Sequence, residues 1–351
     1  MDLDNYDIYS KIDKENMLAQ INNLPDQLQA AWEFGNTLDL PHWVGVRRVL
    51  IAGMGGSAIG ADLLSAYVSP FCPVPVVVHR DYDLPGWING PETLVIVSSH
   101  SGNTEEALSV FYQIQDKNCS QLVISTGGEL VRLALEHEVP IWRFNHSGQP
   151  RAAVGFSFGL LLSLFNRLGL IPDPSQELVE TVAIMHEQQS SLGTRVPIVH
   201  NLAKRLAGQL LDRWVIVMGS DVLAPVARRW KGQINEIGKS LAQFEFLPEA
   251  DHNTLAGIEN PMNLLPNTYA LFLHSQSDHP RNQLRMELTK RIFMIQGIGT
   301  DIVEALGTSR LSHQWTSLQF GDYVAYYLAM AYRVDPTPVE AIEGLKQELD
   351  K

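Results

Sequence analysis

Residues 95–108 join a short apolar run to a cluster of hydroxyl side chains and then to a helix-like segment. Val95–Val97 is typical of a buried strand, and from Glu105 the sequence has helical composition with acidic residues in its first turn. Four hydroxyl side chains and one glycine lie between them, within residues 98–104. Backbone N–H groups at a helix start, joined by hydroxyls, bind a phosphate without a cation. A capped turn without a ligand is the alternative, but capping requires fewer hydroxyls, so we predict an anion site.

A glycine-rich turn precedes this stretch. Arg47–Ala52 is a predicted strand, and it enters Gly53–Gly60, which leads into a helical segment. Dinucleotide sites share this arrangement, but the glycine spacing does not match G-x-G-x-x-G cleanly. The next strand-like run, residues 76–79, is followed by Arg80 instead of the expected acidic residue. We therefore expect no nucleotide cofactor, and we predict that both turns share one ligand at the carboxyl edge of a sheet.

Strand-like and helical segments alternate through the first half of the chain. Residues 14–33 form a helical lead-in despite Pro25. Further strand-like runs lie at Val74–His79, Gln121–Ser125 and Val139–Phe144. Such alternation predicts an α/β fold with a parallel sheet that helices cover on both faces.

The pattern of the first half repeats in the second half. Trp214–Ser220 resembles the first strand and its turn, and Tyr269–Ser275 resembles the strand that enters the hydroxyl cluster. Between the two halves, from Pro172, the chain becomes polar and loses its strand pattern. We therefore predict two domains, at residues 1–172 and 190–351.

The two repeats differ where the first has its anion site. Gln276–His279 replaces the Ser101–Thr104 turn, and Asp278 would repel a phosphate. A longer polar segment of the second repeat, 231–260, contains Glu236 and His252, a carboxylate and an imidazole that can act as an acid/base pair. Taken singly, Glu236 is read as an exposed helical residue and His252 as a capping or solvated one. From the asymmetry we infer that the first domain holds an anion and the second contributes chemistry.

Composition excludes several classes of partner. A net charge of −13 over 351 residues opposes binding to nucleic acid or to an anionic membrane surface. Two cysteines are too few for a disulfide framework or a thiolate zinc site, and Met1–Lys14 lacks a signal-peptide pattern, so we expect a cytoplasmic protein. The most apolar run, Val154–Phe165, is too short to cross a bilayer and predicts a buried helix.

Five motifs together resemble the bifunctional phosphoglucose/phosphomannose isomerases, a family of the sugar isomerase (SIS) superfamily. They are Gly-Met-Gly-Gly-Ser at 53–57, Ser-x-Ser-Gly-Asn-Thr-Glu-Glu at 99–106, Lys-Gly-Gln-x-Asn-Glu at 231–236, Pro-Glu-x-x-His-Asn at 248–253, and Asp-Pro-Thr-Pro-Val-Glu-x-Ile-x-x-Leu-Lys at 335–346. The resemblance implies two SIS domains, each a flavodoxin-like αβα sandwich with a parallel sheet, and helical extensions at both ends. It also implies a homodimer that isomerises hexose 6-phosphates without a metal or cofactor: glucose 6-phosphate to fructose 6-phosphate, and mannose 6-phosphate to fructose 6-phosphate.

The resemblance also assigns roles to single residues. Glu236 resembles the base that moves a proton between C1 and C2 through a cis-enediolate, and His252 resembles the group that opens the sugar ring, from its own chain or across a dimer. Arg151 matches an arginine near the reacting carbons, and Lys346 a C-terminal lysine that returns to the site; local sequence alone makes them a charged helix start and a helix-end cation. The substrate-binding positions are Gly56, Ser57, Ser99, Ser101, Thr104 and, for the choice of C2 epimer, Thr337.

Two other functions fit part of the sequence. A catalytically silent sugar-phosphate sensor needs only the anion site, so the presence of Glu236 and His252 disfavours it. An amino-sugar isomerase or deaminase needs an ammonia-handling partner, which we do not find. One position departs from the family pattern: many relatives carry Tyr where this chain has His100, and we expect that change to preserve phosphate binding while making it pH-sensitive.

Overall fold

The computed structural model describes residues 2–43 and 45–349, which form two compact units. The first unit is Asn23–Val182, and the second combines Met1–Asn22 with Ala183–Lys351. Helix α8 (Ser175–Leu192) runs across the boundary between them. Each unit contains one of the two sequence repeats, and the predicted α/β class is confirmed.

The sheet of the first unit is entirely parallel. Within residues 45–182 its strand order is β2-β1-β3-β4-β5. The strands are β1 (Arg48–Ala52), β2 (Val76–His79), β3 (Thr93–Ser99), β4 (Ser120–Ser125) and β5 (Ile141–Arg143). The carboxyl ends of β1, β3 and β4 therefore share one edge, and every residue of β3 is buried.

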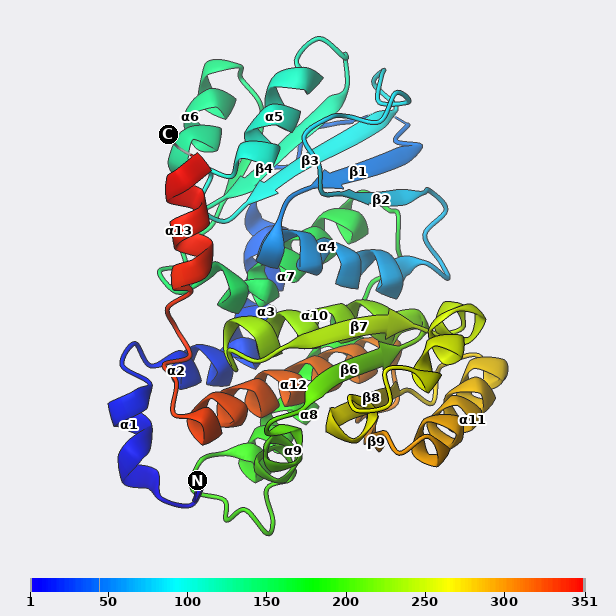
Figure 1. The fold of residues 1–351 in the computed structure, drawn as a ribbon. Coiled ribbons are helices and arrows are strands. Elements are labelled where there is room, and N and C mark those ends of the chain that lie inside the picture. The colour runs from blue at the N-terminus through cyan, green and yellow to red at the C-terminus, as the bar shows by residue number, and fades with distance from the viewer. Residues whose placement is uncertain (1, 44, 350–351) are drawn as a thin grey trace. The chain divides into compact units, whose positions relative to one another are not determined.

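Helices cover both faces of this sheet (Figure 1). Val95, Val97 and Phe111 belong to the core that packs α5 (Glu105–Ile114) and α6 (Gly128–Glu136) on one face. The other face carries α3 (Leu24–Thr37), α4 (Gly55–Val68) and α7 (Val154–Arg167). Helix α7 is buried over most of its length, as its apolar run predicts.

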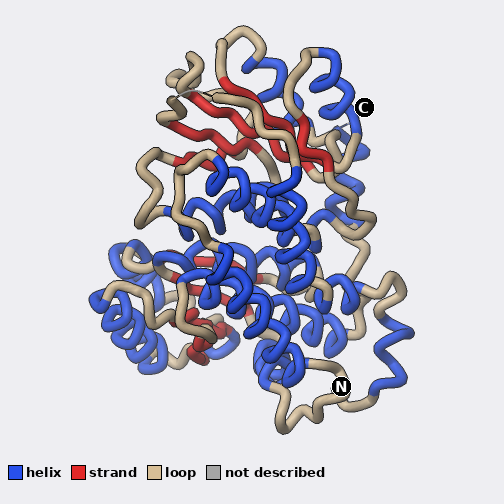
Figure 2. The backbone as a smooth tube through the Cα atoms, turned by 180° about the vertical axis from the view of Figure 1, so that it is seen from behind, coloured by secondary structure: helices blue, strands red, loops and turns tan. Residues whose placement is uncertain are grey.

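The second unit repeats the same strand arrangement. Within residues 183–349 the sheet is parallel with the order β7-β6-β8-β9, so the predicted repeat of two strands is confirmed and extends to four. The strands are β6 (Trp214–Gly219), β7 (Ala242–Phe246), β8 (Thr268–His274) and β9 (Gly299–Glu304). Figure 2 shows the strands of each unit enclosed by helices.

A long helix forms the centre of the second unit. Every residue of α12 (Arg310–Tyr332) from Leu311 to Met330 is buried, because α9 (Leu202–Leu210) and α10 (Ala224–Glu236) pack against it. Helix α11 (Pro280–Ile295) covers the opposite face of the sheet through a core that includes Phe272 and Phe293. The remaining pieces are the short 3-10 helices η3 (Asp221–Leu223), η4 (Glu249–His252), η5 (Thr254–Glu259) and η6 (Leu265–Asn267), and the C-terminal helix α13 (Glu340–Leu349).

The N-terminal residues belong to the second unit. They form η1 (Tyr6–Ile8), α1 (Tyr9–Ile12) and α2 (Met17–Asn22). The fully buried Lys204 donates from Nζ to Asp4 Oδ1 at 3.0 Å and to the Thr194 and Val196 carbonyls at 2.7 and 2.9 Å. The predicted limits 1–172 and 190–351 follow the motifs along the chain, whereas these long-range contacts group residues 2–22 with the C-terminal half.

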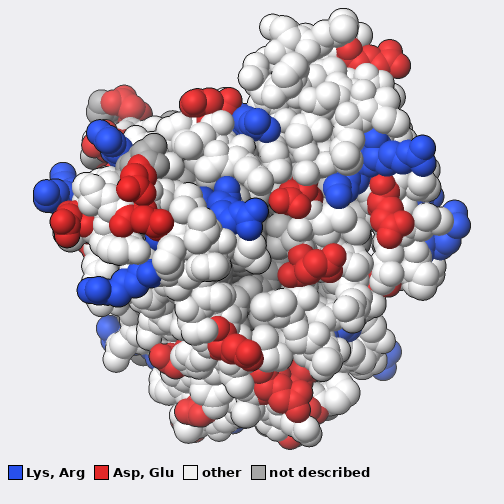
Figure 3. All heavy atoms as spheres, turned by 90° about the horizontal axis from the view of Figure 1, so that it is seen from below, with Lys and Arg blue, Asp and Glu red and all other residues white. Residues whose placement is uncertain are grey.

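The helices and one face of the surface bear on the question of membranes and polyanions. Across the described part of the chain, no helix combines the length and the apolar character that crossing a membrane requires. Acidic and basic side chains are interspersed on the face shown in Figure 3. The excess of acidic residues that gives the net charge of −13 remains the argument against a polyanionic partner.

Candidate active site

The glycine-rich turn of the first unit touches two other segments at backbone distance. A Cβ atom on Gly53 would lie 2.6 Å from the Ser98 carbonyl oxygen, and one on Gly56 would lie 2.4 Å from the Pro150 carbonyl oxygen. Neither position accepts a larger residue without a backbone shift. The glycines thus bring the start of α4, the end of β3 and the segment before α7 together at the carboxyl edge, and the buried Ser57 lies in the first turn of α4.

The hydroxyl turn, Ser98–Thr104, forms the second wall of this edge. Ser99 Oγ lies 2.9 Å from Thr104 Oγ1 and accepts the Gly102 N–H at 3.1 Å. The Asn103 N–H donates to Ser101 Oγ at 3.2 Å, and Thr104 is the N-cap residue of α5. Ser101 is exposed and Ser99 is buried. The turn therefore presents the positive end of the α5 dipole together with an accessible hydroxyl, an arrangement that suits a phosphate.

A third glycine turn, which the sequence analysis did not single out, supports the hydroxyl turn. Gly102 has φ +71°, and a Cβ there would lie 1.8 Å from the Gly127 carbonyl oxygen. Asn103 Oδ1 accepts the Glu129 N–H at 2.9 Å. Gly127 and Gly128 come shortly after the predicted strand Gln121–Ser125, so the sequence could have predicted their position at the same sheet edge.

Arg151 lies on the short 3-10 helix η2 (Pro150–Ala152) in the first unit. Its side chain is only 5% exposed, and Nη1 donates to Gln149 Oε1 at 3.4 Å. Because Gly56 packs on the backbone of Pro150 and Arg151, this buried cation belongs to the same cluster of segments as the two turns. The structure thus gathers the predicted residues of the first unit, Gly56, Ser57, Ser99, Ser101, Thr104 and Arg151, on three adjoining segments.

His100, in the middle of the hydroxyl turn, contacts a second histidine. Its Nε2 lies 3.0 Å from Nδ1 of His146, a residue that the sequence gave no reason to select. Burial and the nearby His146 lower the pKa of His100 to about 4. The ring is therefore neutral near pH 7. Any pH dependence of phosphate binding that His100 causes is expected only at acidic pH, where the ring gains a proton.

In the second unit, Glu236 is the last residue of α10 and faces a cavity of about 530 Å³. The cavity joins the end of α10 to the segment that leads into α13, so two of the sequence motifs meet here. Its lining is Asn235, Glu236, Lys239, Val334, Asp335, Pro338, Val339, Glu340, Ala341 and Ile342.

Buried contacts fix α10, and with it Glu236. Arg229 Nη2 donates to Asp322 Oδ2 of α12 at 2.9 Å, with both side chains 4% exposed. Trp230 Nε1 donates to the Ser317 carbonyl at 2.9 Å. These contacts fix the backbone of α10, so Glu236 is carried at the end of a rigid helix, which favours it as a positioned base.

The other predicted residues of this unit lie at different places. Thr337 is buried, and its N–H donates to Asp335 Oδ1 at 3.0 Å next to the Glu236 cavity. Lys346 is exposed on α13, a helix without a buried residue. His252 is exposed at the end of η4, after β7, whereas Glu236 precedes β7. Neither His252 nor Lys346 is among the described residues that line the Glu236 cavity.

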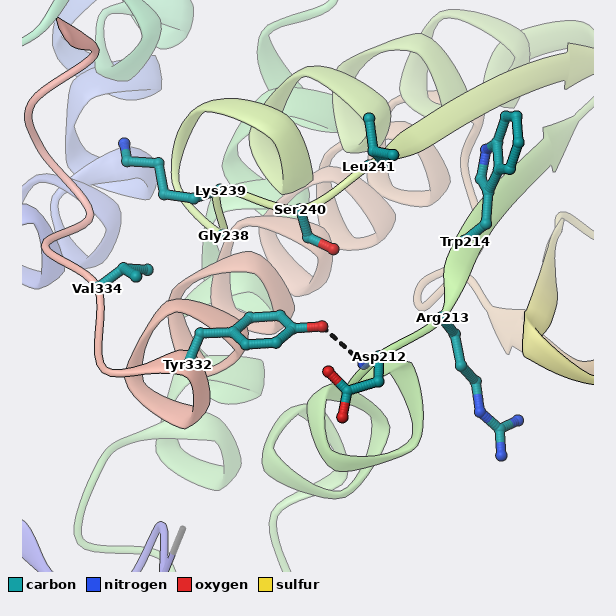
Figure 4. A pocket seen from close by; sticks show the side chains of 9 residues that line it. All are labelled: Asp212, Arg213, Trp214, Gly238, Lys239, Ser240, Leu241, Tyr332 and Val334. Carbon is teal, nitrogen blue, oxygen red and sulfur yellow. Dashed lines mark hydrogen bonds between the residues drawn. The ribbon is translucent and has the colours of Figure 1, made fainter.

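A neighbouring cavity of about 480 Å³ shares Lys239 and Val334 with the first. Figure 4 shows that its two cations, Arg213 and Lys239, point in different directions. The Tyr332 hydroxyl accepts the Asp212 N–H at 2.6 Å. Since its charged groups do not converge, this cavity offers no anion site.

At the carboxyl edge of the second unit a carboxylate lies where the first unit has its hydroxyl turn. Ser220 Oγ donates to Asp278 Oδ2 at 2.6 Å, and Asp278 is 5% exposed. Burial raises the pKa of Asp278 to about 6. Within the described residues, no group of three or more His, Cys, Asp or Glu side chains could hold a metal ion.

Comparisons with known proteins place the chain in a family. Residues 199–349 match the family model described as bacterial phospho-glucose isomerase C-terminal SIS domain. A bifunctional phosphoglucose/phosphomannose isomerase of Caldicellulosiruptor bescii is 40% identical over 95% of this chain and 98% of its own. The protein of that name from Aquifex aeolicus is 33% identical over 87% and 91%.

Solved structures agree on the fold. The C-terminal domain of glucosamine-fructose-6-phosphate aminotransferase from Francisella tularensis superimposes with a TM-score of 0.73 at 14% identity, covering 92% of this chain and 98% of that one. At this identity the likeness concerns the fold alone. Because relatives above 30% identity match most of its length, the chain belongs to the bifunctional phosphoglucose/phosphomannose isomerase family.

Proposed function

We propose that this protein is an aldose–ketose isomerase that interconverts glucose 6-phosphate and fructose 6-phosphate, and mannose 6-phosphate and fructose 6-phosphate. The observation that carries the proposal is Glu236, a carboxylate at the end of a helix that buried contacts hold in place, which lines a cavity of about 530 Å³. The hydroxyl turn of the first unit supplies the phosphate-binding groups that such substrates require. Family membership supports both halves of this assignment.

The chemistry follows from the residue types. The proton on the carbon beside an aldehyde is weakly acidic, so Glu236 removes it from C2 and returns it to C1, with a cis-enediolate between the two steps. The guanidinium of Arg151 stabilises the oxygen on which negative charge develops. The phosphate lies away from the reacting carbons, and its binding energy orients the sugar. Glucose and mannose 6-phosphate differ only at C2 and give the same planar enediolate, so one base serves both when either face of the enediolate turns towards Glu236, and Thr337 contributes to that choice.

His252 is the proposed group for opening the sugar ring, and its position supports a role in a homodimer. It lies at the end of η4, after β7, and is not among the described residues that line the Glu236 cavity. We therefore assign the ring-opening imidazole to His252 of a second copy of the chain. Lys346, exposed on α13, is assigned to the substrate as the C-terminal cation.

In this proposal the enzyme uses no metal or cofactor, and it is located in the cytoplasm. Cys72 and Cys119 are both free, which suits a reducing compartment. The alternative is a sugar-phosphate sensor without turnover, which would use the hydroxyl turn and leave Glu236 idle.

A coupled assay tests the function directly. Purified protein is given fructose 6-phosphate with a chelator present, and glucose 6-phosphate and mannose 6-phosphate are measured separately. Formation of both products is the expected result. Glucose 6-phosphate alone would restrict the activity to one epimer, fructose 6-phosphate binding without either product would favour the sensor, and activity lost to chelator but restored by zinc would refute the metal-free mechanism.

A further inference from the structure

The hydrogen bond between His100 and His146 joins two segments of the first unit that carry substrate-binding groups in the proposed function. His100 is in the middle of the hydroxyl turn, and His146 lies five residues before Arg151 on the loop that follows β5. The 3.0 Å contact between Nε2 and Nδ1 bridges 46 residues of sequence. It is thus a tertiary link between the phosphate-binding turn and the segment that presents the cation.

Aromatic packing fixes both rings in the orientation that this bond needs. The His100 ring meets Phe144 edge-on at 6.0 Å and His146 at 5.1 Å between centroids. Phe156, in the first turns of α7, stacks on Phe144 at 5.0 Å and contacts the His146 ring at 6.0 Å. These four side chains form what we call the aromatic cluster. Since each ring touches two others, neither imidazole can turn without disturbing its neighbours.

The charge state of the pair shows whether the two histidines can act through their charge or only through their hydrogen bond. Burial lowers the pKa of both His100 and His146, so near pH 7 one neutral ring donates its N–H and the other accepts. A neutral pair adds no positive charge for a phosphate. Its contribution is the directional bond, which holds the two backbones at a fixed spacing.

The hydroxyl turn and the loop before Arg151 differ in how much other support they have. The His100 carbonyl accepts the Thr126 N–H at 3.2 Å and the Thr126 hydroxyl at 2.7 Å, and the Gly102 carbonyl accepts the Leu130 N–H at 2.8 Å. Residues 144–149, by contrast, lie in neither helix nor strand. Side-chain contacts such as the histidine bond therefore matter more for the loop than for the turn.

We propose that His100 and His146 are a positioning pair: their hydrogen bond sets the place of Arg151 relative to the bound phosphate, so that the guanidinium meets the oxygen that becomes charged. This inference rests on the proposed isomerase function and on the role of Arg151 in it. Neither histidine touches the reacting atoms. Each acts through the backbone segment that carries it, His100 through the hydroxyl turn and His146 through the loop before Arg151.

The pair has a specific kinetic consequence. The hydroxyl turn keeps its own bonds when His146 is removed, so the KM for fructose 6-phosphate and the inhibition constant of inorganic phosphate change by less than about threefold. The loop loses a constraint, and misplacement of a catalytic group by about 1 Å lowers the rate by up to about 10²-fold. We expect His146→Ala to lower kcat by about 10- to 100-fold.

The experiment measures kcat, KM and phosphate inhibition in the full-length protein for His100→Ala, His146→Ala and the double variant. His100→Gln and His146→Asn are the conservative variants, because an amide nitrogen or oxygen can take the place of Nε2 in the first and Nδ1 in the second. His137→Ala is the control. His137 is an exposed histidine at the C-terminal end of α6, and its ring contacts Phe111. Its kinetics should equal those of the unmodified protein.

A positioning pair predicts that the double variant loses no more than the larger single loss, and that the amide variants recover most of kcat. Unchanged kcat in the alanine variants, or losses that multiply in the double variant, would overturn the pairing. A rise in KM and in the phosphate inhibition constant at constant kcat would instead make His100 a phosphate ligand. If the unmodified protein does not turn over fructose 6-phosphate, the proposed function fails, and this inference fails with it.

Discussion

Asp278 is a buried acid whose replacement by its amide should stabilise the protein at neutral pH. Its Oδ2 accepts the Ser220 hydroxyl at 2.6 Å, while its Oδ1 is buried without a hydrogen-bond partner among the described residues. Burial is the main reason that its pKa is raised from 3.8 to about 6, with a smaller contribution from the negative charge of Asp221. In Asp278→Asn the Ser220 bond is kept, because the amide oxygen can accept it, and the buried charge is removed.

The magnitude follows from the two pKa values. Above pH 6 the carboxylate is ionised in both states, and the folded protein is less stable by the free energy that separates 3.8 from about 6, which is about 3 kcal/mol. Between these values the folded state keeps a proton that the unfolded state has lost, so stability falls as pH rises. Below pH 3.8 both states are protonated and this cost vanishes. Asp278→Asn should therefore gain about 2–3 kcal/mol at pH 7.5 and only about 0.5 kcal/mol at pH 4, close to the unfolded-state pKa.

Thermal unfolding of the variant and the unmodified protein at pH 4, 5, 6 and 7.5 measures this difference. For a unit of this size each kcal/mol shifts Tm by roughly 2–4 °C, so the two curves should separate by several degrees at pH 7.5 and converge in acid. Asp116→Asn, at an exposed position of the first unit, is the control and should follow the unmodified protein at every pH. A gain that does not depend on pH, or no gain at pH 7.5, would refute the argument that a buried charge is responsible.

Three further changes test the proposed site. Glu236→Gln should lower turnover by about 10²–10⁴-fold, the usual contribution of a general base, with little change in the Kd of fructose 6-phosphate, whereas the exposed Glu287→Gln should be silent. Mixed dimers of Glu236→Gln and His252→Ala should regain turnover in a coupled assay if His252 acts across the dimer, because one site then has both intact groups, and should stay inactive if it acts within its own chain. Gly102→Ala should weaken fructose 6-phosphate binding by about tenfold or more in titration calorimetry, since its Cβ would lie 1.8 Å from the Gly127 carbonyl oxygen and φ is +71°; unchanged affinity would contradict the assignment of the turn.

The local sequence pattern was sufficient to predict the strand and the helix on either side of the hydroxyl turn. The strand predicted at Val95–Val97 is part of β3, and the helix predicted from Glu105 is α5. Both are short segments whose burial and capping are set by adjacent residues. The repeat could also be predicted from the sequence. In the second sheet β6 and β8 occupy the places that β1 and β3 have in the first.

Contacts between distant parts of the chain were not predictable in this way. The His100–His146 bond spans 46 residues, and the ion pair of Lys204 with Asp4 spans 200. No periodicity or local motif encodes such pairs, because they depend on how whole elements pack. The same limit applies to His252: its motif supports a role, but only the structure shows that it does not line the Glu236 cavity.

The two units differ in a way that supports the proposed division of labour, with an anion site in one repeat and a base in the other. Their first four strands have the same order, so both present an equivalent turn after the third strand in that order, β3 or β8. In the first unit that turn carries hydroxyls and no carboxylate. In the second, Asp278 brings a carboxylate of its own to the Ser220 hydroxyl, and a second anion there would meet like charge in a buried setting. The carboxyl edge of the second sheet therefore disfavours a phosphate, and the proposed base of this unit, Glu236, lies at the far end of α10. That helix of 13 residues carries Glu236 ~20 Å from the edge where it begins, to a cavity at the amino end of β7.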